Sequence, residues 1–75
     1  MDIKDIEGNP THLSECEATI IWYIITGMTS RSISNLMDIS EKMISYYKLR
    51  AMRKLKVKNN IELSMWLKKK FNKTP

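Results

Sequence analysis

A positively charged stretch with helical spacing of its apolar side chains, residues 40–58, most constrains how this chain can fold. It reads SEKMISYYKLRAMRKLKVK, and no acidic residue occurs between Lys42 and Ile61. Ile44, Ala51 and Leu55 recur at i, i+7 and i+11, so Ala51 and Leu55 each fall within about 20° of Ile44 around a helix. One face of this helix is predicted to pack into a core, while the other presents cations to a negatively charged partner.

Length and charge narrow the possible partners. The chain has 75 residues, enough for one small domain, and a net charge of +5. Five of its eight acidic residues precede residue 18, but only one of its thirteen basic residues does. A basic C-terminal two-thirds favours a polyanion, nucleic acid first and an anionic membrane surface second. A surface charged only for solubility is the remaining alternative.

Several classes of protein are disfavoured by what the chain contains. One cysteine and one histidine allow neither an internal disulfide nor a tetrahedral metal site, and we expect no cofactor. There is no clustered set of acid, base and nucleophile, so we expect no enzyme. The longest apolar run, residues 20–25, is too short to span a membrane, and no signal peptide opens the chain. We expect a cytoplasmic protein, associated with the nucleoid when it is bound to DNA.

Caps and periodicity predict an all-α fold of four helices, at about 14–26, 30–37, 41–56 and 61–70. Ser14 and Glu17 have the spacing of a capping box, and Gly27 follows as a stop. Thr29 or Ser30 is expected to cap the second helix and Ser40 the third. We therefore expect a flexible leader at 1–12, a single domain at 13–71 and a disordered tail at 72–75.

The second and third predicted helices, joined by three residues, have the lengths of a helix-turn-helix unit. In such a unit the second helix lies in the major groove of DNA, so its outward face carries the contacts. On the side of the third helix opposite its core face lie Lys42, Ser45, Tyr46, Leu49, Arg50 and Arg53. A solvated face explains the cations, but Tyr46 and Leu49 among them indicate a surface that a partner covers.

From Leu13 to Leu67 the chain resembles the LuxR-type (GerE/FixJ/NarL) helix-turn-helix domain of bacterial transcription factors. The resemblance covers over fifty residues without a gap, and it lies in the full register of the motif rather than in any single element. The residues that stand at the positions of the motif are Leu13, Ser14, Glu17, Ile20, Ile21, Gly27, Ile33, Ser34, Met37, Ile39, Ser40, Met43, Ile44, Tyr47, Ala51, Lys54, Leu55 and Val57. Segments 45–48 and 59–63 look closest to the enterobacterial capsule-regulator branch of that family.

The resemblance implies roles for individual positions. It implies base contacts from Ser45, Tyr46 and Leu49. It implies phosphate contacts from the start of the second helix, from the third helix and from the basic residues around its end; with the cations of the outward face, the candidates are Thr29, Ser30, Arg31, Lys42, Tyr47, Arg50, Arg53, Lys54, Lys56 and Lys58. Met43 and Tyr47 depart from the usual Thr and His, and Leu49 cannot hydrogen-bond a base. These side chains can therefore make few specific contacts with bases, and we expect two copies or two related domains to bind DNA together.

The fourth predicted helix supplies a surface for such pairing. Ile61 and Met65 lie on the side opposite Leu63, next to Lys68. Because relatives dimerise through this helix, we expect a homodimer, or a heterodimer with another LuxR-type regulator, bound to double-stranded DNA. Ordinary exposed hydrophobic residues are the alternative interpretation. The function predicted first is a bacterial transcriptional regulator, or its isolated DNA-binding domain. The alternative is an interaction module that modulates another such regulator through the fourth helix.

Overall fold

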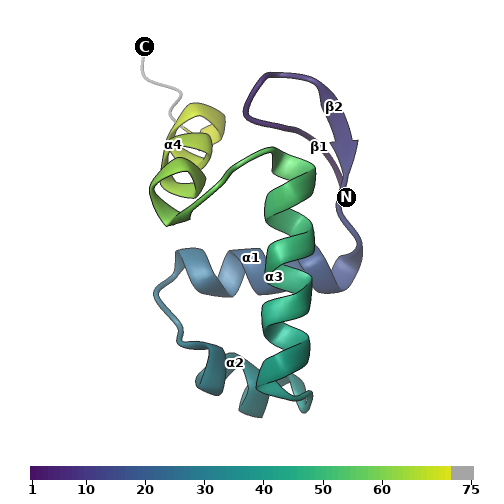
Figure 1. Cartoon of the computed structure of the whole chain (residues 1–75), viewed down its shortest axis with the longest axis vertical. Coiled ribbons are helices and arrows are strands. Elements are labelled where there is room, and N and C mark those ends of the chain that lie inside the picture. Colours follow the sequence, from purple (N-terminus) through teal and green to yellow (C-terminus); the bar gives the residue numbers. More distant parts are fainter. Residues whose placement is uncertain (72–75) are drawn as a thin grey trace.

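The computed structural model describes residues 1–71, with side chains through Lys69, and contains four helices (Figure 1). They are α1 (Glu15–Ile25), α2 (Ser30–Met37), α3 (Glu41–Leu55) and α4 (Asn60–Phe71). Each begins and ends within one residue of its predicted range, so the predicted four-helix, all-α fold is confirmed. The disordered tail predicted at 72–75 lies outside the described residues.

Side-chain caps fix where the first three helices begin. The Ser14 hydroxyl accepts from the Glu17 backbone N–H while the Glu17 carboxylate accepts from the Ser14 N–H, which forms the predicted capping box. Thr29 and Ser40 cap α2 and α3 by accepting from the backbone N–H three residues further on. Each cap satisfies a backbone donor that has no partner within its helix, so the starts of these short helices are well defined.

The three residues between α2 and α3 make a tight connection. Asp38 ends α2 in the left-handed backbone conformation, with φ of 56°. The Ser34 hydroxyl of α2 donates to the Ile39 carbonyl, and Ser40 already caps α3. This connection holds α2 against the N-terminal half of α3, as a helix-turn-helix unit requires.

Helix α3 carries the inward face predicted from its spacing, because Ile44, Ala51 and Leu55 are all fully buried. Ile44 packs with Ile20 of α1 and Ile33 of α2 in one apolar cluster. Ala51 and Leu55 belong to a second cluster, shared with α1, α4 and the N-terminal segment. Helix α3 therefore runs across α1, with α2 beside its first turns and α4 near its last (Figure 1).

Within residues 1–12, where the sequence predicted a flexible leader, the structure contains an antiparallel hairpin of β1 (Asp2–Lys4) and β2 (Pro10–His12). Ile3 in β1 is buried in the larger core cluster. The Asp5 carboxylate closes the connection by accepting from the backbone N–H groups of Glu7 and Asn9. The leader prediction is corrected: this segment is part of the packed domain.

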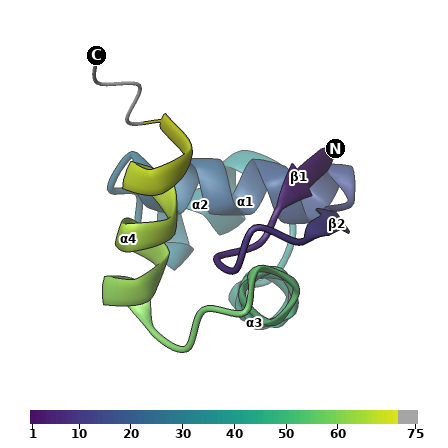
Figure 2. The same cartoon turned by 90° about the horizontal axis from the view of Figure 1, so that it is seen from above.

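Contacts with distant parts of the chain hold the hairpin in place. The Ile6 backbone N–H donates to the Leu55 carbonyl at the end of α3, at 2.9 Å. From α4, Trp66 Nε1 donates to the Lys4 carbonyl at 2.8 Å, and Lys69 Nζ donates to the Ile6 carbonyl at 3.1 Å. The hairpin thus lies over the C-terminal end of α3 and beside α4 (Figure 2).

None of the helices described is both long enough and apolar enough to cross a membrane. Among the same residues, no three His, Cys, Asp or Glu side chains gather into a group that could hold a metal ion.

Candidate nucleic-acid interface

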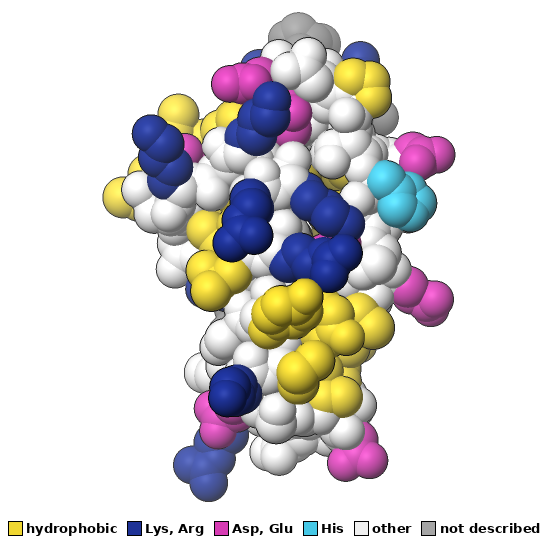
Figure 3. Space-filling model, turned by 45° about the vertical axis from the view of Figure 1, so that its right-hand side comes forward, with side chains coloured by type: hydrophobic (Ala, Val, Ile, Leu, Met, Phe, Trp, Pro, Cys, Tyr) yellow, Lys and Arg dark blue, Asp and Glu magenta, His cyan; other side chains and the backbone are white. Residues whose placement is uncertain are grey.

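The three predicted base-reading residues share the outward face of α3. Ser45 is exposed, and the side chains of Tyr46 and Leu49 are 50% and 61% exposed. Tyr46 and Leu49 line a shallow hollow together with Arg50 and Arg53. Figure 3 shows cationic side chains gathered directly beside an apolar patch on this side of the molecule. An exposed face of this kind combines charge for phosphates with apolar surface for bases.

One buried carboxylate organises the cations along α3. Glu17 of α1 is only 1% exposed, and its Oε1 accepts from Lys54 Nζ at 2.7 Å. Arg50 Nε lies 3.1 Å from Glu17 Oε2, close enough for an ion pair but not aligned for a hydrogen bond. Burial alone raises the pKa of Glu17, but hydrogen bonds from Lys54 and Ser14 outweigh it, and the net pKa lies below the ordinary value.

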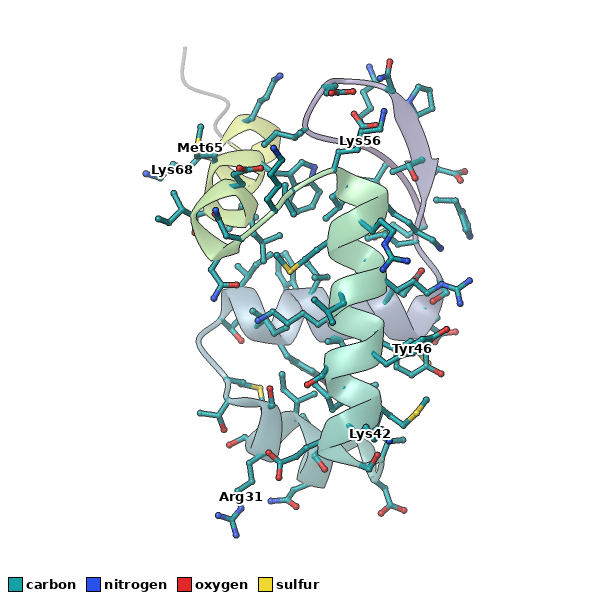
Figure 4. The ribbon with its side chains drawn as sticks, viewed as in Figure 1. Arg31, Lys42, Tyr46, Lys56, Met65 and Lys68 are labelled. Carbon is teal, nitrogen blue, oxygen red and sulfur yellow. The ribbon has the colours of Figure 1, made fainter. Side chains whose placement is uncertain are left out.

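Tyr46 is held by its neighbours on α3. Arg50 Nη1 donates to the Tyr46 hydroxyl oxygen at 3.1 Å. The rings of Tyr46 and Tyr47 meet edge to face, with centroids 5.4 Å apart. The hydrogen bond to Tyr46, together with the charge of Glu17, raises the pKa of Arg50, so the guanidinium stays charged. Tyr46 therefore projects from the helix in a supported position (Figure 4).

Lys56, a predicted phosphate contact, is paired with the hairpin. Its Nζ lies 3.0 Å from Glu7 Oε1 and 3.7 Å from Asp5 Oδ2. The hydrogen bond to Glu7, together with the charges of both acids, raises the pKa of Lys56. Lys56 is also the residue that ends α3, in the left-handed conformation. Lys58, by contrast, is exposed, and its backbone N–H donates to the Glu62 carboxylate.

The candidates at the start of α2 lie near the N-terminal end of α3. Thr29 is occupied as the α2 cap, and its hydroxyl also donates to Ser32. Ser30 is half-buried, whereas Arg31 is exposed. Figure 4 shows Arg31 and Lys42 at the same end of the molecule, with Lys56 at the other. Tyr46 lies between them, so Arg31, Lys42 and Lys56 mark out the length of the candidate surface.

Tyr47 is placed differently from the other candidates. It is half-buried and packs against the cluster of Ile20, Ile33 and Ile44. Its main contribution is therefore to the support of Tyr46 and of the core.

The predicted dimer residues form a separate exposed surface. Ile61 and Met65, one turn apart on α4, are 73% and 57% exposed, and Lys68 is exposed beside them. In Figure 4 Met65 and Lys68 extend from the outer side of α4, on the opposite side of the molecule from Tyr46. A contact through this surface would leave the outward face of α3 accessible.

The pairing of acids with these cations was only partly predictable. The capping box located Glu17 but not the cation of α3 that it faces, and the structure pairs its carboxylate with Arg50. The stronger contact with Lys54 was not predicted, because helical spacing alone does not specify which residue of α1 faces α3. The contacts of Lys56 depend on the hairpin, which the sequence did not indicate.

A comparison with known protein families matches residues 11–67 to GerE, described as "Bacterial regulatory proteins, luxR family". No curated protein matches the chain. The matched residues make up more than half of the chain. They include all of α1, α2 and α3, together with Ile61 and Met65 of α4. This is a family of DNA-binding, helix-turn-helix transcription regulators and not of enzymes. The chain belongs to the luxR family of bacterial regulatory proteins.

Proposed function

We propose that this chain regulates transcription in bacteria by inserting α3 into the major groove of double-stranded DNA. The observation that carries the proposal is the outward face of α3, where Tyr46 and Leu49 are exposed beside Arg50 and Arg53. The major groove, about 12 Å wide, admits an α-helix with its side chains. In this position Ser45, Tyr46 and Leu49 reach base edges.

The cations at the two ends of this face position the domain on the backbone. Arg31 and Lys42 lie at one end of the molecule, and Lys58 follows the other end of α3. Thr29 and Ser30 are at the start of α2, where helix N–H groups favour phosphate. Lys54 is already paired with Glu17, and Lys56 with the acids of the hairpin. Each therefore attracts phosphate less strongly than an unpaired lysine would.

Anisotropy of a fluorescent duplex, measured between roughly 50 and 200 mM salt, tests this proposal. A DNA-binding domain loses affinity steeply over this range, because each neutralised phosphate releases counterions. Arg53→Ala should weaken binding to all duplexes alike, while Tyr46→Ala should change sequence preference. Lys4→Ala, which removes one charge from the hairpin, is the matched control and should leave affinity close to wild type. No binding at low salt would refute the proposal.

We further propose that the exposed surface of Ile61, Met65 and Lys68 joins two subunits on DNA, in a homodimer or in a heterodimer with another LuxR-type regulator. The exposure of Ile61 and Met65 supports this, because two large apolar side chains one turn apart are left uncovered. Sedimentation of wild type and Met65→Lys with a duplex tests it. Equal self-association and equal cooperativity in the two proteins would rule this surface out.

An interaction module is the second candidate function. It is supported by the weak base-reading chemistry of Ser45 and Leu49 together with the open surface on α4. In that role the chain would pair through α4 with another LuxR-type regulator and alter its DNA binding. The salt titration separates the two functions, since a module of this kind need not bind duplex alone. We also propose, from segments 45–48 and 59–63, that the chain is nearest to the capsule-regulator branch of the family.

A further inference from the structure

The contact between Arg50 and Tyr46 has a fixed direction. A guanidinium carries only N–H donors and accepts no hydrogen bond. In the 3.1 Å contact with Arg50 Nη1, the Tyr46 oxygen must therefore be the acceptor. The phenol has one proton of its own, so the strongest hydrogen bond that it still has to offer a partner is one that it donates.

Arg50 is itself anchored to the body of the domain. Its Nε lies 3.1 Å from Oε2 of Glu17, a carboxylate that is 1% exposed and fixed by Lys54 and by the Ser14 backbone. One end of the guanidinium is thus directed at a buried acid, and the other at the Tyr46 oxygen. Since a planar guanidinium is rigid, its position limits the positions of the Tyr46 hydroxyl.

Packing against Tyr47 also restricts the side chain of Tyr46. The ring of Tyr47, which is half-buried against the core, packs edge to face against the Tyr46 ring, with the two ring centroids 5.4 Å apart. Tyr46 is therefore supported at its oxygen by Arg50 and along its ring by Tyr47. A side chain placed in this manner loses less conformational entropy when it binds.

Arg50 is also poorly suited to the phosphate contact predicted for it. Part of its charge is already balanced by Glu17, and two of its nitrogens face protein atoms. Arg53, on the next turn of α3, is exposed and lines the same hollow as Tyr46 and Leu49. Of the two arginines, Arg53 is the one available to the DNA backbone.

We infer that Arg50 is a positioning residue that makes Tyr46 a fixed hydrogen-bond donor in the major groove. This rests on the proposed function of α3. A donor is satisfied by N7 or O6 of guanine, by N7 of adenine or by O4 of thymine. The amino group of cytosine is itself a donor and cannot accept a hydrogen bond from Tyr46. Tyr46 therefore selects an acceptor-bearing base at its contact position and discriminates against cytosine.

The test begins with a duplex selected by the full chain from random sequences. Each base of the selected site is then replaced by an analogue that lacks one major-groove acceptor or weakens it: 7-deazaguanine, 7-deazaadenine, 6-thioguanine or 4-thiothymine. At one position the wild-type protein should lose affinity by roughly 2- to 10-fold, the effect of a single hydrogen bond. Tyr46→Phe, which lacks the hydroxyl, should bind the natural and substituted duplexes equally.

Arg50→Met tests whether Arg50 holds the Tyr46 hydroxyl in position. The variant keeps the Tyr46 hydroxyl, yet its discrimination between the natural and substituted duplexes should fall toward that of Tyr46→Phe. The Arg50 side chain is 53% exposed, so the variant is expected to fold, which circular dichroism checks. Arg53→Met is the matched control: it removes the same charge one turn away, so overall affinity falls while discrimination at the position remains.

The possible results separate the two levels of the inference. If the wild-type protein binds no duplex, both the proposed function and the role of Arg50 are overturned. If it binds selectively but no acceptor deletion distinguishes wild type from Tyr46→Phe, the donor assignment alone fails. If Arg50→Met discriminates as well as wild type, Arg50 does not position Tyr46.

Discussion

Replacing Glu17 by Gln tests how much of the fold depends on one buried charge. The substitution keeps the size of the side chain, and its amide oxygen can still accept from the Ser14 N–H, so the capping box survives. What is lost is the negative charge facing Lys54 at 2.7 Å and Arg50 at 3.1 Å. The experiment thus removes the ion pairs between α1 and α3 with little change to local helix geometry.

The expected magnitude follows from the exposure of the two cations. Lys54 is 29% exposed, so its charge-assisted hydrogen bond to Glu17 is worth about 1.5–3 kcal/mol. Arg50 is 53% exposed, and a pair of that exposure adds at most about 1 kcal/mol. Both cations can turn to solvent when the acid is gone, which avoids the larger cost of stranding a buried charge. We expect the free energy of unfolding to fall by about 2 kcal/mol at neutral pH.

The pH dependence gives the prediction its sharpest test. The pKa of Glu17 is lowered in the folded protein, so its contribution is complete above the unfolded-state value of about 4.3. It is lost as pH falls through the folded-state pKa, because the acid is then protonated in both states. Gln does not titrate, so the difference between wild type and Glu17→Gln should shrink at acidic pH.

Urea unfolding followed by circular dichroism at about pH 7 and about pH 3 measures this difference. Glu15→Gln, an exposed acid in the first turn of the same helix, is the control. It should cost only about 0.5 kcal/mol through the helix dipole. A Glu17→Gln variant as stable as this control, or one whose deficit is the same at both pH values, would refute the reasoning.

Three further predictions concern the core, the hairpin and the charge balance. Ile44→Ala should lower the free energy of unfolding by about 2–5 kcal/mol, because the side chain is fully buried; a urea titration giving less than about 1 kcal/mol would contradict this. Trp66→Phe should cost about 1 kcal/mol for the lost hydrogen bond to the Lys4 carbonyl, and an unchanged urea midpoint would show that this bond contributes nothing. Glu7→Gln should leave Lys56 only its 3.7 Å contact with Asp5, tightening binding at low salt and steepening the salt slope by up to about one unit; an unchanged slope would show that Lys56 gains no phosphate contact.

The helices were predictable because their determinants are local. Ser14, Thr29 and Ser40 cap their helices through the N–H three residues ahead, and this spacing is visible in the sequence. The period of Ile44, Ala51 and Leu55 likewise identified the buried face of α3. Caps and periodicity are properties of one segment at a time, so they need no knowledge of the neighbouring elements.

The hairpin and the ion pairs were not predictable from such signals. Each strand has three residues, too few for an alternating pattern to stand out, and the hairpin is held by groups more than forty residues away. The helical period predicts on which side of α3 Lys54 lies, but it does not predict that Glu17 of α1 faces it. Met52, one residue beyond the predicted core positions, is also buried because α4 and the hairpin enclose that end of α3.

The contact between Trp66 and Lys4 has a consequence for the order in which the domain assembles. It joins residues 62 positions apart, whereas Ile33 and Ile44 of the smaller cluster are close in sequence. Closing a longer loop costs more entropy, and an isolated hairpin this short is barely stable in water. The turn between α2 and α3 should therefore form early, and the hairpin should dock last. Trp66 is 4% exposed and Trp22 54%, so Trp66 fluorescence should follow this final step in refolding experiments.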